Sequence, residues 1–288
     1  MTRVSHIRRH FLRAYYMAAK VVCPGLRNSQ FAYRDALEEV VRPNVSWLDL
    51  GCGHQLFPDW MPDSLASQTA LVRRAARAVG VDAVDLRPHV AGLPKIAANI
   101  ERLPFRSESF SLITANMVVE HVLNPSRLLS EINRVLVPGG LFLFHTPNAS
   151  YFEVAIARRI PSAVMKVVAR FLDGRGEDDI FPTHYRLNKA SDIRDFASAA
   201  GLNPSSIRYV ECTAQGVMLG PLVLLELLVI RMLRSRRFQA YRSDLVVALQ
   251  KPVAATLPLA EVAAMTGSAS GGGQTRARCH RDLEEQLG

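Results

Sequence analysis

The chain has 288 residues, of which 49% are hydrophobic and 21% are charged, as is typical of a globular protein. This length suffices for one large domain with appended segments. The formal net charge is +9, but it is concentrated in two stretches without acidic residues: residues 1–34 carry seven basic side chains, and residues 231–242 carry five arginines. Two local patches are unlike a continuous nucleic-acid groove, so we expect no nucleic-acid partner.

The cysteine pattern and the N-terminus bear on the compartment. The four cysteines show neither metal-ligand nor disulfide spacing; they are Cys23, Cys52, Cys212 and Cys279. We therefore predict no metal site and a reducing, cytoplasmic location. Arg13 and Lys20 interrupt the first apolar run, which disfavours a secretory signal. The arginine-rich, acid-free start leaves a transit peptide open as an alternative.

Two helices are predicted before the first strand. Apolar residues recur at helical spacing over residues 5–22, and Cys23-Pro24-Gly25 ends that pattern. A second helix is predicted over residues 30–41, and Pro43-Asn44 separates it from the first strand. We interpret residues 1–43 as capping helices, which would cover either the cofactor or one face of a sheet.

Strand and helix patterns alternate over residues 44–252, which predicts the α/β class. Strands are predicted at residues 45–50, 79–82, 96–99, 110–116, 141–146, 206–212 and 244–251. Helices are predicted at residues 64–78, 125–136 and 189–200, with Ser64 as a candidate N-cap. Residues 253–288 lose hydrophobic periodicity and contain a Gly/Ser-rich run, so we predict a flexible C-terminal tail.

The first predicted strand ends in Asp49-Leu50-Gly51-Cys52-Gly53. Glycines permit backbone angles closed to other residues and let a ligand approach the main chain. In an open α/β sheet, ligands bind beyond the carboxyl ends of the strands, so this turn is a candidate cofactor site. Leu56 stands where a dinucleotide fingerprint has its third glycine, which disfavours an NAD-dependent oxidoreductase. The Asp49 carboxylate suits a cationic ligand, such as the ammonium and sulfonium of S-adenosylmethionine (SAM).

Four downstream segments carry a resemblance to a known family. They are Ala78-Val79-Gly80-Val81-Asp82, Glu101-Arg102-Leu103-Pro104-Phe105 with Ser109-Phe110-Ser111-Leu112-Ile113, Asn116-Met117-Val118-Val119-Glu120-His121, and Arg134-Val135-Leu136-Val137-Pro138-Gly139-Gly140. In order and spacing they resemble class I SAM-dependent methyltransferases of the methyltransferase type 11 branch. Gln55 replaces the third glycine of the family's G-x-G-x-G motif, and an insertion, residues 56–67, follows it.

The resemblance implies a Rossmann-like fold, in which a doubly wound, mostly parallel sheet of seven strands has an antiparallel last strand. It also implies SAM as the cofactor. The implied cofactor-binding residues are Asp49, Gly51, Cys52, Gly53, Asp82, Asn99, Ile100, Asn116 and Met117. Asp82 would hold the ribose hydroxyls, with Asp85 as a rival, because an ionised carboxylate accepts two hydrogen bonds. Asn99 would bond the adenine amine, and Ile100 would pack on the ring.

Three residues are candidates for catalysis: His121, His184 and Tyr185. His121 follows the fourth strand and could act as a general base near neutral pH, or anchor its loop. Residues 149–186 are interpreted as a substrate lid, because irregular loops on a rigid scaffold often carry function. His184 and Tyr185 could instead tie down the next helix. Met117 occupies the first position of the E-x-x-E-H metal motif of related quinone methyltransferases, so no metal is predicted.

An apolar run followed by arginines spans residues 217–237. It is short for a membrane span, which needs about 20 apolar residues, and Glu226 interrupts it. The pattern is compatible with a helix that lies in a membrane interface and with a core or dimer helix, and the sequence leaves both open.

The sequence therefore predicts an enzyme that transfers a methyl group from SAM to a small-molecule or amphiphilic acceptor, such as a lipid, quinone or glycolipid-like compound. The expected location is cytoplasmic, with peripheral membrane contact through residues 217–237 as an extension. The alternative is a non-catalytic module of the same fold that binds membrane or protein partners. The acceptor atom and the oligomeric state stay open.

Overall fold

The structure, a computed structural model, describes residues 3–84, 87–152, 154, 182–213 and 222–253. The chain divides into two units, Met1–Pro252 and Val253–Gly288. The predicted C-terminal tail lies outside the described residues except for Val253, as do residues 155–181 of the predicted lid and residues 217–221 of the apolar run.

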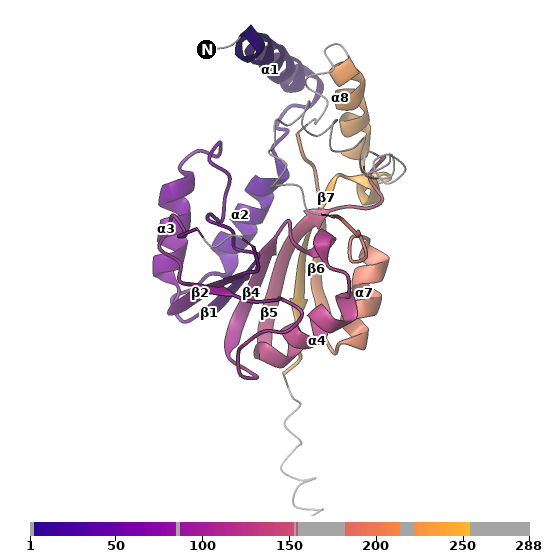
Figure 1. Ribbon diagram of the computed structural model, residues 1–288. Helices are drawn as coiled ribbons and strands as arrows, with labels where there is room; N and C mark the ends of the chain where they lie inside the picture. Colours follow the sequence, from indigo (N-terminus) through magenta and orange to yellow (C-terminus); the bar gives the residue numbers. More distant parts are fainter. Residues whose placement is uncertain (1–2, 85–86, 153, 155–181, 214–221, 254–288) are drawn as a thin grey trace, which may run out of the picture. The chain divides into compact units, whose positions relative to one another are not determined.

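Seven strands form one sheet in the order β3-β2-β1-β4-β5-β7-β6 (Figure 1). Their bounds are β1 (Ser46–Leu50), β2 (Arg77–Asp82), β3 (Lys95–Ala97), β4 (Phe110–Asn116), β5 (Leu136–Pro147), β6 (Asn203–Val210) and β7 (Asp244–Gln250). The pairs β1–β2, β1–β4, β2–β3 and β4–β5 are parallel, whereas β7 is antiparallel to both β5 and β6. The predicted fold class is confirmed: a mostly parallel α/β sheet with an antiparallel last strand.

Strand β1 joins the two halves of the sheet. Asp49 lies opposite Gly80 on β2 and opposite Thr114 on β4. The carboxyl ends of these three strands therefore finish at one edge. Because successive strand side chains point to opposite faces, Trp47 and Asp49 share one face and Leu48 the other.

Helices cover both faces of the sheet (Figure 1). Their bounds are α1 (Arg3–Val22), α2 (Ser29–Val40), α3 (Ser64–Arg74), α4 (Pro125–Val135), α7 (Ala190–Ala199) and α8 (Leu222–Leu233), with short 3-10 turns η1 (Val119–His121) and η4 (Gln239–Tyr241). On one face, α2 and α3 bury Leu37 and Leu71 with Trp47. On the other face, α4 and α7 bury Leu128 and Ile193 in the cluster that contains Leu48. The alternating side chains of β1 thus contribute to the apolar cores on both faces of the sheet.

Helix α1 packs against α8, far from it in sequence. Tyr15, Ala19 and Cys23 form a buried cluster with α8 side chains. Arg231 and Arg234 donate hydrogen bonds to the carbonyls of Val22 and Pro24, at 2.7 Å each. Among the described residues, no helix has the length and apolar character required to cross a membrane.

Several predicted boundaries were wrong around the third helix. α3 ends at Arg74 rather than at residue 78, because Ala75 is already extended and Arg77 pairs with Ser46 as the first residue of β2. Ser64 is not the N-cap, since Asp63 occupies that position in a left-handed conformation. The Ser64 hydroxyl instead donates to the Phe57 carbonyl at 3.1 Å.

The edges of the sheet also differ from the predicted ranges. β5 begins at Leu136 rather than at residue 141, because the segment with Pro138 continues the strand across a register shift opposite Phe110–Leu112. β6 begins at Asn203, which pairs with Gln250, and ends at Val210. β3 is only three residues long, Lys95–Ala97, and pairs with the last three residues of β2.

Gly80 is required by the packing of β2 against the glycine turn. A Cβ added there would lie 2.5 Å from Cys52 Sγ and 2.9 Å from Cys52 Cβ. We predict that Gly80→Ala lowers the free energy of unfolding by about 1–3 kcal/mol through overpacking. Urea denaturation should show a smaller loss in a Cys52→Ala background, because the sulfur is then gone. Equal losses in both backgrounds would mean that the strand, not this contact, sets the cost.

Candidate active site

The glycine turn after β1 has backbone conformations that favour glycine. Gly51 and Gly53 have φ values of +62° and +50°. The Gly51 amide donates to the Val81 carbonyl at 2.7 Å, which closes the turn onto β2. A Cβ at Gly51 would clash with the Val118 side chain, from the segment that follows β4. Both glycines are therefore needed for the turn itself, in addition to any close approach of a cofactor.

Asp82, at the carboxyl end of β2, is bonded to this turn. Its Oδ2 accepts a hydrogen bond from the Gly53 amide at 2.9 Å, and its Oδ1 accepts one from the Val84 amide at 2.8 Å. Lys95 supports the same turn, because its Nζ donates to the Gly53 carbonyl at 2.6 Å. The carboxylate is thus held in one orientation. Asp85, the rival for the ribose contact, lies outside the described residues.

Asp49 is buried on the α2 face of β1. It accepts a hydrogen bond from the Thr114 hydroxyl, and the Trp47 indole donates to the same hydroxyl at 2.7 Å. Burial raises the pKa of Asp49 to about 7 against the effect of the Thr114 bond, and the charge of Asp82 adds to the rise. A cation bound beside Asp49 would favour its ionised form. Cys52 is also buried, and its small side chain fills the space next to Gly80.

Asn116, at the end of β4, joins three elements through its carboxamide. Its Nδ2 donates to Gln30 Oε1 of α2 at 2.9 Å and to the Leu56 carbonyl at 3.2 Å. Its Oδ1 lies 2.9 Å from His145 Nδ1. Burial lowers the pKa of His145 to about 3, so this imidazole is neutral and its Nδ1–H donates to Asn116. The Asn116 side chain is therefore bound by protein groups, and the sequence reasoning missed its partners Gln30 and His145.

Met117 has a left-handed backbone with φ +57° and a partly exposed side chain. Its amide donates to the His145 carbonyl at 2.9 Å, which holds the chain at the sheet edge. Strained non-glycine residues of this kind cluster at functional sites. The pocket-lining role of Met117 stays a prediction, and its left-handed backbone is shared with Asp63, Glu108 and Tyr185.

Asn99 and Ile100 follow β3. Asn99 is exposed, and its Oδ1 accepts a hydrogen bond from the Glu101 amide at 2.8 Å in a local turn. Ile100 is half-buried and packs against the main core cluster. The adenine contacts of both residues stay predictions, and the turn at Asn99 engages the oxygen that an adenine amine would need.

The three predicted catalytic residues are brought together around Glu120. The amides of His184 and Tyr185 donate to the Glu120 carbonyl at 2.7 and 3.1 Å. His121 Nδ1 lies 2.9 Å from the Pro182 carbonyl, which can only accept, so Nδ1 carries the proton and Nε2 is the acceptor. Burial lowers the pKa of His121 and the nearby His184 lowers it further, although the bond to Pro182 opposes this. His121 is thus a neutral base at pH 7.

Glu120 itself was not predicted as a site residue. Its side chain is buried, Oε2 accepts a hydrogen bond from the Thr146 hydroxyl at 3.0 Å, and Oε1 lies 4.0 Å from His121 Nε2. Asn188 donates to the same Thr146 hydroxyl at 2.6 Å. Burial raises the pKa of Glu120 to about 7, against its hydrogen bonds, and Asp244 adds to the rise. Its position directly before His121 in a recognised motif was the available signal.

Comparison with known proteins identifies the family. Residues 20–207 match the family described as a methyltransferase domain. The chain belongs to this methyltransferase family. The match bears out the predicted resemblance to class I SAM-dependent methyltransferases, with SAM as the cofactor.

Individual known proteins are similar to parts of the chain. The rat 2-methoxy-6-polyprenyl-1,4-benzoquinol methylase is 33% identical over 35% of the chain and 31% of its own length. A probable SAM-dependent methyltransferase of Mycolicibacterium smegmatis is 30% identical over 45% of the chain and 51% of its own length. A solved SAM-dependent methyltransferase from Mesorhizobium loti is 18% identical, with a TM-score of 0.49, over 77% of this chain and 97% of its own. The chain spans about a third of the length of the first curated relatives that it matches.

The described ends of the predicted lid are anchored to the sheet edge. The Ala149 amide donates to the Asn188 carbonyl at 2.8 Å. Tyr151 is buried beside Tyr185 in a small apolar cluster that includes Leu233 of α8. No group of three or more His, Cys, Asp or Glu side chains in the described part of the chain is arranged to hold a metal ion. The lid assignment of the methyltransferase stays a prediction.

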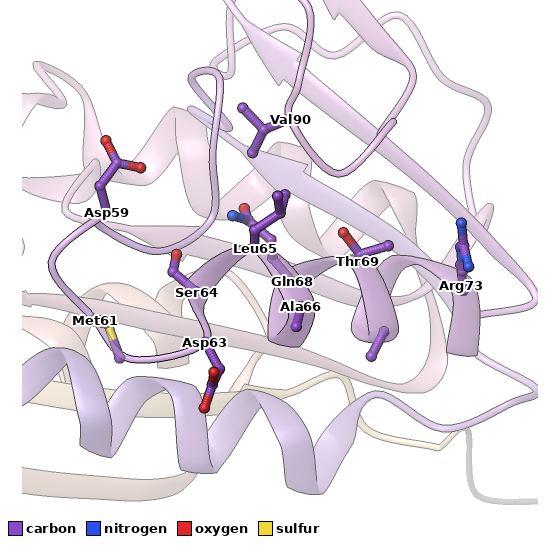
Figure 2. Close-up of a pocket in the computed structure, with 11 residues that line it drawn as sticks. Asp59, Met61, Asp63, Ser64, Leu65, Ala66, Gln68, Thr69, Arg73 and Val90 are labelled. Carbon is purple, nitrogen blue, oxygen red and sulfur yellow. The ribbon is translucent and has the colours of Figure 1, made fainter.

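A cavity of about 900 Å³ lies against α3 (Figure 2). Its lining includes Asp59, Leu65, Thr69, Arg73 and Val90. None of the residues that line it carries a predicted cofactor or catalytic role, so this cavity does not coincide with the candidate site at the strand ends.

We predict that Asp82→Ala weakens SAM binding by about 1.5–3 kcal/mol, because a charged acceptor for the ribose hydroxyls is lost. Isothermal titration calorimetry measures the change in affinity. The Asp82→Asn variant keeps one acceptor oxygen, so its SAM affinity should lie between those of wild type and Asp82→Ala. Thermal unfolding of each variant separates this effect from loosening of the Gly53 turn. Unchanged affinity in Asp82→Ala, with a loss only in Asp85→Ala, would transfer the ribose contact to Asp85.

Glu120 should make stability depend on pH. Its pKa in the folded protein, about 7, lies above the ordinary 4.5, so the folded state keeps a proton that the unfolded carboxyl has already lost between these values. Its contribution to stability is complete below about pH 4.5 and is lost as the pH rises through about 7. Across this range, urea denaturation should show wild type losing about 2–3 kcal/mol more than Glu120→Gln, which cannot ionise. If the free energies of unfolding of wild type and Glu120→Gln change equally with pH, Glu120 is not the titrating group.

Proposed function

We propose that this methyltransferase transfers the methyl group of SAM to a small-molecule acceptor that reacts beside His121, His184 and Tyr185. The observation that supports the proposal is that the predicted cofactor and acceptor residues lie at one edge of the sheet. The acidic glycine turn after β1, Asp82 at the end of β2 and the strained Met117 after β4 all lie there, and His121 follows four residues later. Cofactor and acceptor residues are thus adjacent along the same edge.

His121 is the group best placed to take a proton from the acceptor. Its Nε2 is the unprotonated nitrogen, because Nδ1 donates to Pro182. When bound, SAM would supply an electrophilic methyl group. The electron pair of the broken methyl–sulfur bond would stay on the sulfur of SAM. The acceptor proton passes to His121 Nε2, and the buried Glu120 Oε1, 4.0 Å from that nitrogen, lies where its negative charge can stabilise the imidazolium. Positioning of the acceptor in line with the methyl–sulfur bond supplies much of the rate.

An amphiphilic acceptor is favoured by the surroundings of Tyr185. This residue packs against the buried cluster of Ala149, Tyr151, Val154 and Leu233. The apolar part of a substrate would rest on that side, with its reacting end near the histidines. The names of the relatives are consistent with this: one is a polyprenyl benzoquinol methylase, and one from Erwinia billingiae, 34% identical over 43% of the chain, is a malonyl-[acyl-carrier protein] O-methyltransferase.

We predict that His121→Ala slows methyl transfer by about 10²–10⁴-fold, the range for loss of a general base, with unchanged SAM affinity. A His184→Ala/Tyr185→Phe variant should also lose turnover and retain SAM affinity, because the backbone amides that bond these residues to the Glu120 carbonyl are kept. The measurements are transfer of labelled methyl from SAM and calorimetry of SAM binding. The acceptor is found by offering labelled SAM with cell extracts, with and without their lipids.

Tyr241→Phe is the matched control, because Tyr241 is an exposed tyrosine of η4 without a proposed role. It should transfer methyl groups as wild type does. Loss of SAM binding in the His184→Ala/Tyr185→Phe variant would assign these residues to the cofactor pocket or to the fold. SAM binding without label transfer to any extract fraction would favour the alternative of a non-catalytic module.

A further inference from the structure

Helices α1 and α8 form a two-helix unit, the α1–α8 pair, with one buried side. Val223, Leu227 and Ile230 of α8 pack against α1. Two of the arginines near the end of α8 are used within the pair, because Arg231 and Arg234 bond to the carbonyls that end α1. The pair is therefore held by its own core and by directed hydrogen bonds, which leaves the opposite sides of both helices facing outward.

The outward side of α8 is apolar. Leu224, Leu225, Leu228 and Met232 are 46–62% exposed. At 3.6 residues per turn these positions share one side of the helix, opposite Val223, Leu227 and Ile230. Glu226, the acidic residue within Leu222–Leu233, is half-buried and lies away from this side. The acidic residue that interrupts the apolar run thus lies off the exposed apolar face.

The outward side of α1 mixes apolar and basic side chains. Tyr16, Met17 and Val21 are 57–80% exposed, and Arg13 and Lys20 are exposed between them. No acidic residue occurs among residues 1–34 or 227–243. The outward side of α8, together with the exposed Arg236 and Arg237 just beyond that helix, is called the apolar–basic surface.

We propose that the apolar–basic surface binds the surface of an anionic lipid membrane. Exposed apolar residues supply area to bury among acyl chains, and the long side chains of Arg236 and Arg237, just beyond the helix, can reach the head groups. A second copy of the chain is a poor occupant. A two-fold interface would set this surface against itself and bring Arg236 and Arg237 toward like charges, without acidic residues of the surface to neutralise them.

Helix α8 lies next to the candidate acceptor site. Val229 and Leu233 of α8 and Phe238 belong to the same apolar cluster as Tyr151 and Tyr185. Membrane contact would therefore bring the site close to amphiphilic molecules, a consequence that rests on the proposed function. Lipid binding itself does not, so it is tested without SAM and without an acceptor.

Vesicle flotation with the full chain tests the proposal. The protein should float with phosphatidylcholine vesicles that contain phosphatidylglycerol, less so with pure phosphatidylcholine, and less at high salt. Arg236→Gln/Arg237→Gln should weaken binding roughly 30-fold, because each basic residue near the surface contributes a factor of about five. These two arginines are chosen because Arg231 and Arg234 hold the pair together. Arg73→Gln/Arg106→Gln, with the same charge loss at exposed positions on other elements, should bind as wild type.

A second pair of variants tests the apolar part. Leu225→Gln/Leu228→Gln should abolish flotation, whereas Leu65→Gln/Val90→Gln, at comparably exposed positions by α3, should not. Thermal unfolding verifies that all variants fold. Absence of flotation at low salt with anionic vesicles would overturn the proposal, as would equal losses in the control variants. Sedimentation showing a dimer that Leu225→Gln/Leu228→Gln dissociates, without flotation, would assign the surface to a second copy. Methyl transfer to a soluble acceptor is measured separately, so each proposal can fail alone.

Discussion

The register of β1 between β2 and β4 is the constraint on which the candidate site depends. Asp49 is paired with Gly80 on one side and Thr114 on the other. The Thr114 hydroxyl can therefore bond to Asp49, and Gly80 leaves room for Cys52 of the glycine turn. A slip of one residue would move Asp49 to the opposite face and break both contacts. Parallel pairing also ends the strands at one level, which is where side chains from distant motifs can meet.

The polar groups at this edge are buried or half-buried, and they bond to one another. Asn116 connects α2, the segment after the glycine turn and β5, while Glu120 connects η1 to Thr146 and Asn188. Buried polar groups are costly unless they are paired, so these bonds hold the loops in one arrangement. Burial also moves the pKa values of Asp49 and Glu120 to about 7. Their charge is thus sensitive to what binds beside them, as acid–base chemistry at neutral pH requires.

The α1–α8 pair is held together by apolar side chains from segments that are distant in sequence. Residues more than 200 positions apart share a buried core there, and the Cys23 thiol donates to the Leu227 carbonyl at 3.2 Å. Once those faces are buried, the remaining faces of both helices are exposed, and they are apolar or basic. The adjoining cluster around Tyr151 and Tyr185 connects this unit to the lid ends. An apolar exposed surface beside a candidate acceptor site is the arrangement expected for an amphiphilic substrate.

The sequence by itself determined the α/β order, the glycine turn, Asp82 and the family motifs, because these depend on local patterns and on residue types with special backbone or charge properties. His121, His184 and Tyr185 were also named from the sequence, but only the tertiary structure brought His184 and Tyr185 beside His121, by bonding their amides to the Glu120 carbonyl. The end of α3 and the start of β5 were missed because strand pairing overrode local signals. Glu120, His145 and Gln30 were missed because their roles come from partners 26 to 86 residues away. Which face of α8 is exposed depends likewise on α1, a contact that no local pattern encodes.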